Sequence, residues 1–508
     1  ALAPGNPNIG VMLPYTPGHM LLFRYPEEEN SQEPAMSEVL VMTSGNPSGA
    51  PICMTDAEAE KYLAPMCDEI LSNPRKIRIR ADDSVMSFYR NQPYMIRRSR
   101  GYAPLPTVLP QEYHHSVLGI GGELKNTFGL LRGDMNYMSP YIGDMADVRS
   151  VEALELAEER LERLLEITPE AVVCDLHPKY NTGEVARKLA EEKGIPCMEV
   201  QHHYAHVLSC MAENEWDAPV IGVSFDGTGF GTDGTIWGGE ILLADYKAFQ
   251  RFGCITPFLQ IGGDASSREG WRIAVSMLYG QMKDRAAAMT MIEKLNLCSA
   301  QDAKVQMAMA DRKINAVMST SVGRLFDGVS AILGIRKAST FEGEASMALE
   351  FAAEAYEKKH QNAVDLQHAM DEMRKQFPLA ACIDNKESES TETNKPEQVK
   401  AVLNTGALVK TIAEARLAGA DTEKLAYFFH WILAEEIIAA CQKARKESGR
   451  GTVALSGGVF QNQLLLKMVD EGLQKEGFKV LRHRLVPPND GGIALGQAVY
   501  AMNNSLSV

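Results

Sequence analysis

The sequence predicts an α/β protein whose first part, residues 1–108, is a mixed α+β domain. Two observations lead to this fold class. From about residue 116 to 240, apolar runs of strand length alternate with helical patterns, as in proteins that alternate strands with helices. Residues 250–508 are richer in helical patterns and close with a strand, a glycine loop and a helix, followed by an aspartate loop and a last helix.

The individual elements follow from local patterns. In residues 1–108, short apolar runs stand between Pro and Gly turns, and we expect strands at 11–13 and 39–42. Closely spaced prolines after Arg100 predict a linker at 109–115, followed by a second domain over 116–508. Residues 151–167 predict a helix with Leu154, Leu161, Leu164 and Leu165 on one apolar stripe. Residues 383–400 are almost without apolar side chains and predict a mobile surface loop.

Composition excludes several classes of protein. The 508 residues carry 66 Asp and Glu against 51 Lys and Arg, a net charge of −15, which disfavours broad binding to nucleic acid. No run approaches the ~20 apolar residues that span a bilayer, so we expect no membrane segment. The nine cysteines are scattered, and none is in a CxxC pair. They predict reduced thiols in the core and therefore a cytoplasmic protein. We expect none of them to be a catalytic thiol.

Four glycine-rich turns follow apolar runs, at 119–126, 225–231, 259–264 and 454–462. Glycine lets backbone N–H groups approach an anion closely, and Lys125 in the first turn adds a positive charge. None of the four fits the P-loop or the dinucleotide-binding fingerprint. Each taken alone is more typical of an ordinary turn, but four together favour a nucleotide held between two lobes.

A pair of histidines indicates a metal site. His202 and His206 are four residues apart, so a helix would place both imidazoles on one face, whereas His203 would point elsewhere. Asp226 and Asp490, both in loops, could complete the ligand set, which suits Fe or Zn without choosing between them. Two surface or capping histidines remain the alternative. His177 either contacts substrate or forms, together with Asp175, a turn that caps the next helix, and the sequence leaves this open.

Longer phrases resemble a known family. SGNPSGAPI, ADDSV and RRSRGYAPLP resemble the second half of the YrdC-type adenylate-forming domain in the hydrogenase-maturation carbamoyltransferase family HypF. GGELKNTFGL, CDLHPKY, HHYAHVLSC, FDGTGFGTDGTIWGGE, SGGVFQN and PPNDGG resemble, in order, the TsaD-like domain of that family, which belongs to the actin and sugar-kinase superfamily. The resemblance runs from about residue 8 to 502 and implies a partial YrdC-like domain followed by a two-lobed TsaD-like domain, with lobes at about 116–245 and 246–508.

The resemblance also implies an activity. Family members use ATP and the carbamate released from carbamoyl phosphate to form carbamoyl-adenylate. They then pass the carbamoyl group to the C-terminal cysteine of the partner HypE, for the cyanide ligands of nickel–iron hydrogenase. The implied cofactors are ATP, Mg²⁺ with the ATP, and a divalent Fe or Zn ion in the TsaD-like domain. No nucleic acid or membrane partner is implied.

The resemblance also implies roles for individual residues at the positions that match the family's motifs. The implied metal ligands are His202, His206, Asp226 and Asp490, and the implied catalytic residues are Lys125, His202, His206 and Asp226. The implied nucleotide-binding residues are Ser44, Asn46, Arg97, Arg100, Lys125, Gly227, Gly229, Gly263, Asp264, Glu342, Gly343, Gly457, Gly458 and Asn462.

The sequence also departs from the family pattern. It lacks the acylphosphatase-like domain, the zinc-finger modules with their zinc, and the first half of the YrdC-like domain, so we expect a truncated version of a longer protein. Three alternatives stay open. The first is a threonylcarbamoyl-tRNA transferase, which the acidic net charge disfavours. The second is a small-molecule O-carbamoyltransferase, which the order of the domains disfavours. The third is a docking subunit that binds nucleotide but does not catalyse a reaction.

Overall fold

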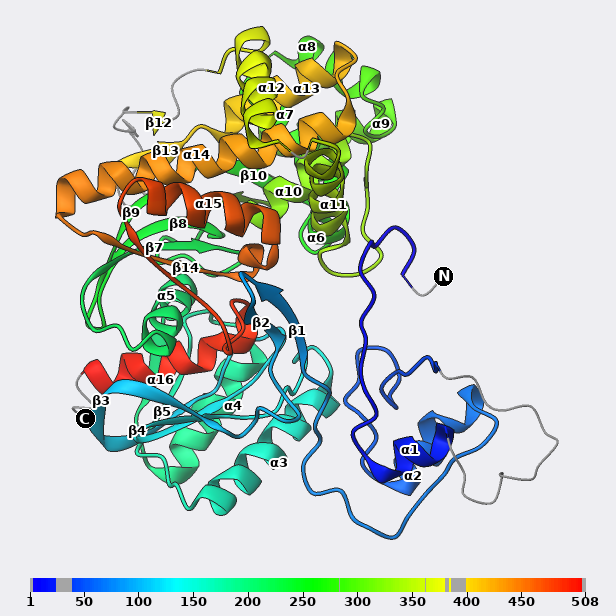
Figure 1. The fold of residues 1–508 in the computed structure, drawn as a ribbon, viewed down its shortest axis with the longest axis vertical. Coiled ribbons are helices and arrows are strands. Elements are labelled where there is room, and N and C mark those ends of the chain that lie inside the picture. Colours follow the sequence, from blue (N-terminus) through cyan, green and yellow to red (C-terminus); the bar gives the residue numbers. More distant parts are fainter. Residues whose placement is uncertain are drawn as a thin grey trace. The chain divides into compact units, whose positions relative to one another are not determined.

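The computed structural model describes residues 3–23, 39–282, 284–360, 362–379, 383–384 and 399–504 (Figure 1). The chain divides into two compact units. The first consists of Ala1–Pro47 and Ile52–Lys76, and the second of Ser48–Pro51 and Ile77–Val508.

Among its described residues, the first unit contains three short helical elements, α1 (Pro17–Phe23), α2 (Asp56–Tyr62) and the 3-10 turn η2 (Ala64–Met66). A capping box between Thr55 and Glu58 starts α2. The prediction of strands at 11–13 and 39–42 is wrong, because these residues are described and belong to no strand. Val11 and Val39 are 85% and 79% exposed. An apolar run becomes a strand only when a neighbouring chain pairs with its backbone.

The second unit contains a hairpin and a four-stranded sheet near its start. The hairpin joins β1 (Val85–Tyr89) to β2 (Gln92–Arg97). The sheet has the order β4-β3-β5-β6, in which β3 and β4 are antiparallel and β5 and β6 run parallel to β3. Its strands are β3 (Pro106–Gly119), β4 (Gly129–Met138), β5 (Ala171–Asp175) and β6 (Cys197–Val200). Helix α4 (Asn181–Lys193) packs against β5 and β6 of this sheet, and helix α3 (Val148–Leu165) packs against α4.

A seven-stranded sheet repeats this connectivity. Its order is β12-β13-β9-β8-β7-β14-β15, with β7, β8 and β9 antiparallel and β14 and β15 parallel to β7. An antiparallel hairpin followed by two parallel strands therefore occurs twice, as expected for two lobes. The strands are β7 (Val220–Phe225), β8 (Gly239–Ala244), β9 (Phe249–Ile255), β12 (Ile383–Asp384), β13 (Ala401–Leu403), β14 (Thr452–Ser456) and β15 (Lys479–Arg482).

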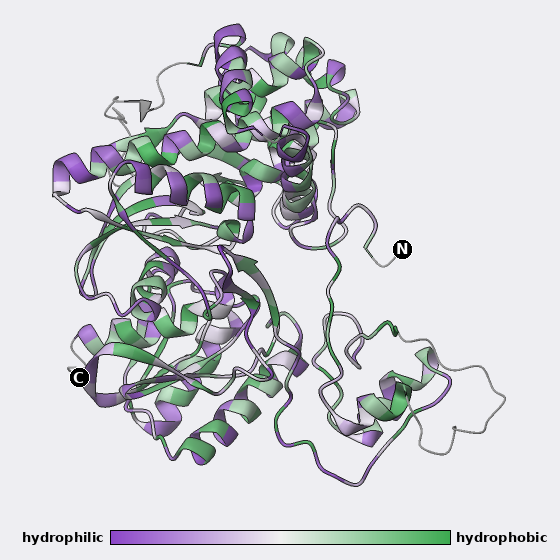
Figure 2. Ribbon diagram, viewed as in Figure 1, coloured by the Kyte–Doolittle hydropathy of each residue, from purple (hydrophilic) through white to green (hydrophobic). Residues whose placement is uncertain are grey.

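Helices and a strand pair complete the second lobe. They are β10 (Phe258–Ile261), α6 (Ala265–Arg268), α7 (Gly270–Met282), α8 (Arg285–Lys294), α9 (Ala300–Arg312), β11 (Ala316–Ser319), α10 (Val322–Ile332), α11 (Glu344–Lys359), α12 (Ala363–Gln376), α13 (Thr405–Leu417), α14 (Thr422–Ser448), η3 (Gly458–Gln461) and α15 (Gln463–Lys475). The central strands β7, β8 and β14 are buried along their whole length and are rich in hydrophobic residues, which are green in Figure 2, as expected for a sheet covered on both faces.

Two helices lie between the two sheets in Figure 1, α5 (His202–Glu213) and α16 (Ile493–Asn503). Each follows the last strand of one sheet, and they cross in close contact. A Cβ atom at Gly496 would lie 1.9 Å from the carbonyl oxygen of Ala205, so only glycine permits this separation. A cluster of buried apolar residues that includes Val207, Leu208 and Leu495 surrounds the crossing.

The structure corrects several expected boundaries. The linker expected at 109–115 lies inside β3, which pairs with β4 through irregular register at Val108 and Tyr113. The lobe boundary expected near 245 would cut the seven-stranded sheet, because β7 and β8 already belong to it. In the expected loop at 383–400, residues 383–384 form β12 beside β13, and residues 385–398 lie outside the described part.

The expected helix at 151–167 is present as α3, but its apolar stripe differs in part. Leu154 and Leu161 are buried and Leu165 is partly buried, whereas Leu164 is 64% exposed, because it lies one residue away from the covered face. Eight cysteines lie in the described part, all as free thiols, and four of them are buried; Cys67 is exposed and Cys382 lies outside it. No helix among the described residues is long and apolar enough to cross a membrane.

The β1–β2 hairpin packs against the second lobe. The Tyr94 hydroxyl donates to the carbonyl of Phe460 at 2.7 Å, and Tyr94 and Met95 are buried. The backbone N–H of Met95 donates to the carbonyl of Arg484 at 2.8 Å. The hairpin therefore folds with the later residues, although we expected the first domain to extend to residue 108.

Replacing Gly496 with alanine tests the helix crossing. The added methyl group would push α16 away from α5, and we expect Gly496→Ala to lower the free energy of unfolding by about 1–3 kcal/mol. Gly280 in α7 is the matched control, because a Cβ there meets nothing within 4 Å, so Gly280→Ala should be neutral or slightly stabilising. Urea unfolding measures both, and equal effects would contradict the role of the crossing.

Candidate metal centre

The two histidines lie on the first turns of α5. Gln201 caps this helix, because its side-chain oxygen accepts from the backbone N–H of Tyr204 at 2.9 Å. His202 and His206 are 2% and 1% exposed, and their ring centroids are 4.9 Å apart. The helical spacing predicted from the sequence is confirmed. His203 is also buried, and its Nδ1 contacts the Gln201 side chain instead.

Asp226 comes from the second sheet, directly after β7. Its Oδ2 lies 3.2 Å from Nε2 of His202 and 3.4 Å from Nε2 of His206. The backbone holds this carboxylate in place, because Gly458 N–H donates to Oδ1 at 3.1 Å and Asp226 N–H donates to the carbonyl of Gly238 at 2.8 Å. The strand end thus brings an acidic ligand to the α5 histidines.

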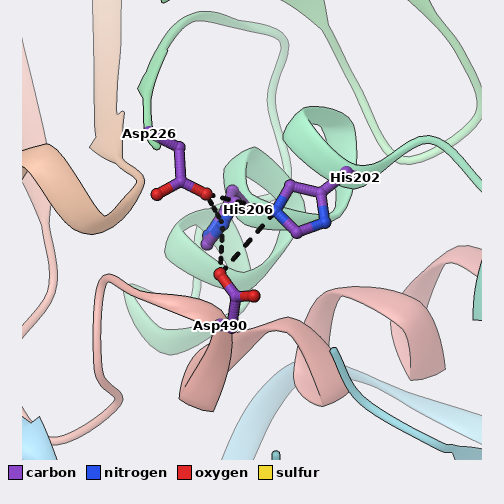
Figure 3. A group of neighbouring side chains, drawn as sticks. All are labelled: His202, His206, Asp226 and Asp490. Atoms are coloured by element: carbon purple, nitrogen blue, oxygen red, sulfur yellow. Dashed lines mark hydrogen bonds and ion pairs between the residues drawn. The ribbon is translucent and has the colours of Figure 1, made fainter. Parts of the chain in front are cut away.

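Asp490 opens the short turn η4 (Asp490–Gly492), which leads directly into α16. Its Oδ1 lies 3.7 Å from Nε2 of both His202 and His206. Figure 3 shows the four side chains pointing to one centre, and their ligand atoms all lie within 4.8 Å of one another. The structure therefore brings together the four residues that the sequence singled out as metal ligands.

These residues fit a divalent cation. Nε2 of His206 is buried and makes no hydrogen bond, as expected of an atom that binds a metal ion. Burial acts to raise the pKa of Asp226, but His202 and His206 outweigh it and hold this pKa well below its ordinary value. Two nitrogen and two carboxylate donors suit Zn²⁺ or Fe²⁺.

Sequence reasoning missed two residues that support this centre. The sequence indicates Asp175 only as a turn residue before the next helix, yet its Oδ2 lies 2.6 Å from Nδ1 of His202. Glu213, at the far end of α5, accepts from the backbone N–H groups of Leu485 at 2.6 Å and Val486 at 2.9 Å. It thereby anchors the loop that leads to Asp490. Asp175 ends an apolar strand run, which could have signalled it, but Glu213 carries no pattern of this kind.

Lys125 lies beside the centre and pairs with a residue of the second lobe. Its ammonium group donates to both carboxylate oxygens of Glu342, at 2.5 and 2.6 Å. Burial acts to lower the pKa of Lys125, but Glu342, Asp490 and Asp226 outweigh it and the pKa is raised. A Cβ at Gly122, in the same glycine turn, would lie 3.1 Å from Oδ2 of Asp490.

Two of the expected nucleotide-binding turns also border the centre. A Cβ at Gly229 would lie 2.4 Å from the His203 ring, and one at Gly457 would lie 2.2 Å from the carbonyl oxygen of Phe225. Gly227 contacts the start of α10, where the Ser321 hydroxyl donates to its carbonyl at 2.7 Å. These glycines therefore allow close packing of the turns around Asp226.

Other expected nucleotide residues have different surroundings. Asn462 caps α15 through its Oδ1 and donates to Nε2 of the buried His430 at 2.9 Å. Gly343 is the N-cap of α11 with φ +76°. Gly263 has φ +55° and lies near Asn315, with Asp264 exposed beside it. Nucleotide contacts of these residues stay predictions.

The residues expected around the ATP phosphates fall in both units. Ser44 and Asn46 belong to the first unit, and Arg97 and Arg100 to the second. Arg97 donates through Nε to the carbonyl of Asp83 at 3.0 Å, and Arg100 contacts the Asp83 carboxylate at 3.2 Å. The expected grouping of the four residues stays a prediction.

Family models match nearly the whole chain. A model described as "Telomere recombination", of the Sua5/YciO/YrdC type, matches residues 1–99. The model "HypF Kae1-like domain" matches residues 112–213, and "Carbamoyltransferase, Kae1-like Domain, second subdomain" matches residues 222–497, which is more than half of the chain. The chain belongs to the HypF carbamoyltransferase family. The expected order, a YrdC-like domain before a Kae1-like (TsaD-like) domain, is confirmed.

Individual HypF proteins agree with this assignment. The chain is 35% identical to carbamoyltransferase HypF2 of Cupriavidus necator, over 99% of this chain and 62% of that protein. It matches the crystal structure of T. kodakarensis HypF with a TM-score of 0.82 and 32% identity, covering 99% of this chain and 61% of the other. A full-length HypF solved in a phosphate- and nucleotide-bound form gives a TM-score of 0.77 and 34% identity, covering 91% and 66%.

The chain spans about three-fifths of the length of the curated HypF relatives that it matches across nearly all of its own residues.

The metal centre leads to a direct test. We expect the purified protein to bind one Zn²⁺ or Fe²⁺, and His206→Ala to weaken this binding at least tenfold, because one of four ligands is lost. His203→Gln is the control, since His203 is buried on the same helix but contacts Gln201. Chelator competition measures the affinities. Equal loss in both variants, or none in either, would contradict the site.

Proposed function

We propose that this chain carries the carbamoyl-transfer centre of a hydrogenase-maturation carbamoyltransferase. The convergence of His202, His206, Asp226 and Asp490 beside the Lys125 turn is the observation that carries the proposal. In this proposal ATP, with Mg²⁺, and carbamate derived from carbamoyl phosphate give carbamoyl-adenylate. The carbamoyl group then moves to the C-terminal cysteine of a HypE-type partner, as a precursor of cyanide ligands.

The geometry suits a mixed anhydride, which carries a phosphate and a polarisable carbonyl close together. A divalent ion bound by the four ligands would supply a Lewis acid for the carbonyl and phosphate oxygens. The raised pKa of Lys125 keeps its ammonium group charged, so it can bind a phosphate oxygen that displaces Glu342. The glycine turns at 227–229 and 457–458 keep side chains away from the space beside Asp226.

The nucleophile would come from the partner. Burial raises the pKa of both Cys254 and Cys441 to about 12, so neither is a thiolate at neutral pH. In the transfer step, the partner's cysteine would first lose its proton to solvent, and its thiolate sulfur would bond to the carbamoyl carbon while the carbon–oxygen bond to the phosphate breaks. AMP would leave with the bonding electrons, and Lys125 would stabilise the charge on its phosphate.

A transfer assay tests this function. Synthetic carbamoyl-adenylate, the metal-loaded protein and a purified HypE-type acceptor should give an acceptor heavier by one carbamoyl group in intact mass spectrometry. We expect no product with His202→Ala, or with an acceptor whose terminal cysteine is replaced by serine. No transfer by the folded, metal-loaded protein would favour the docking-subunit alternative. Salt-dependent tRNA binding with transfer to tRNA would favour the threonylcarbamoyl reaction.

The Lys125–Glu342 pair gives a second test. Lys125→Met should weaken ATP binding about tenfold or more, because a charged phosphate contact is lost. Glu342→Gln should instead strengthen it, since the phosphate no longer competes with a carboxylate for Lys125. The exposed pair Lys188–Glu155 provides matched controls, Lys188→Met and Glu155→Gln, which should bind ATP normally. Weaker ATP binding by Glu342→Gln would contradict the competition and support a direct contact of Glu342 with the nucleotide.

A further inference from the structure

Asp175, the last residue of β5, has both carboxylate oxygens engaged. Its Oδ2 lies 2.6 Å from Nδ1 of His202, and its Oδ1 accepts from the backbone N–H of His177 at 2.9 Å. The Asp175 and His202 side chains are 1% and 2% exposed. A carboxylate with this degree of burial is costly unless a hydrogen-bonded partner compensates it.

The sheet register explains why the two residues meet. β5 runs parallel to β6, and Asp175 lies opposite Val200, the last residue of β6. The chain leaves β6 through Gln201 and begins α5 at His202. The two strands therefore end side by side, with the Asp175 carboxylate directly at the first residue of the helix.

The contact fixes the ring of His202 from one side. Nδ1 contacts Asp175, and Nε2, on the opposite side of the ring, lies 3.2 Å from Asp226 and 3.7 Å from Asp490. A carboxylate oxygen accepts a hydrogen bond, so in the metal-bound state, in which the imidazole carries a single proton, Asp175 keeps that proton on Nδ1. The lone pair of Nε2 then points to the centre of the ligand cluster.

From this geometry we infer that Asp175 is a positioning residue that makes His202 a metal ligand through Nε2. The inference rests on the metal centre of the proposed function. Asp175 is not a fifth ligand, because both of its oxygens already have partners within the protein. Histidine ligands are commonly held in this way by an acceptor on the second nitrogen, and loss of such a partner typically weakens metal binding 10–100-fold.

The variant Asp175→Asn tests the inference. An amide can present its NH₂ group to Nδ1 and shift the imidazole proton to Nε2, which blocks the ligand atom. We expect the affinity for Zn²⁺ and for the spectroscopic probe Co²⁺ to fall about 10–100-fold, with a changed visible spectrum of the Co²⁺ form. Chelator competition and absorption spectra give these quantities without any assay of carbamoyl transfer.

Asp470→Asn is the matched control. Asp470 is likewise a buried carboxylate, 0% exposed, and it accepts from the Tyr89 hydroxyl at 2.8 Å on the α15 face of the second lobe. Both variants exchange a buried carboxylate for an amide, so both should lower the thermal unfolding midpoint of the metal-free protein. Only Asp175→Asn should change the Co²⁺ spectrum and the metal affinity.

The outcomes separate this inference from the proposed function. Wild-type affinity and spectrum in Asp175→Asn would overturn the role of Asp175 and leave the metal centre standing. A wild-type protein that binds neither Zn²⁺ nor Co²⁺ would overturn both. If Asp175→Asn fails to fold, ¹⁵N-histidine NMR of the zinc-loaded wild type tests the inference, because it shows which ring nitrogen of His202 carries the proton. A proton on Nδ1 of His202 supports the inference, and its absence overturns it.

Discussion

The crossing of α5 and α16 is the constraint on which the site depends. Each helix leaves the last strand of a different sheet, and the contact between Gly496 and Ala205 sets how closely they approach. His202 and His206 begin one helix and Asp490 precedes the other, so the distance between the helices sets the distance between ligands. Asp226 comes from the second sheet, and Glu213 ties the Asp490 loop to the far end of α5. The metal centre is thus a property of how two lobes pack, and no single element contains it.

The sequence predicted those parts that local chemistry determines. The four-residue spacing of the histidines, the aspartate after an apolar strand and the aspartate before a helix are all visible in a linear pattern, and the structure brings them together. The order of the two domains followed from motifs that are long enough to be specific. The α3 helix was also predictable, because its buried leucines recur with helical spacing. In each case the residues of one short segment are sufficient for the prediction.

The missed features depend on partners that are distant in the chain. The apolar runs at 11–13 and 39–42 have strand composition, but the described chain offers their backbone no neighbouring strand. Residues 109–115 look like a linker because of their prolines, yet β4 pairs with them through an irregular register. The change of sheet between β6 and β7 is invisible in sequence, since strands of both sheets are equally apolar. Asp175 gains its role only because β5 and β6 end side by side.

The β1–β2 hairpin has a consequence for how this protein can be divided. The first family model ends at residue 99, but Tyr94 and Met95 belong to the buried interior of the following unit, and the Asn489 side chain donates to the carbonyl of Ile96 at 3.0 Å. Homology and folding therefore place the border at different points. A gene rearrangement that joined a new first domain at residue 99 would remove the native hairpin, whereas one joined near residue 76 would inherit it intact. The folding unit that contains the hairpin thus includes residues from 77 onwards, which the first family model also matches.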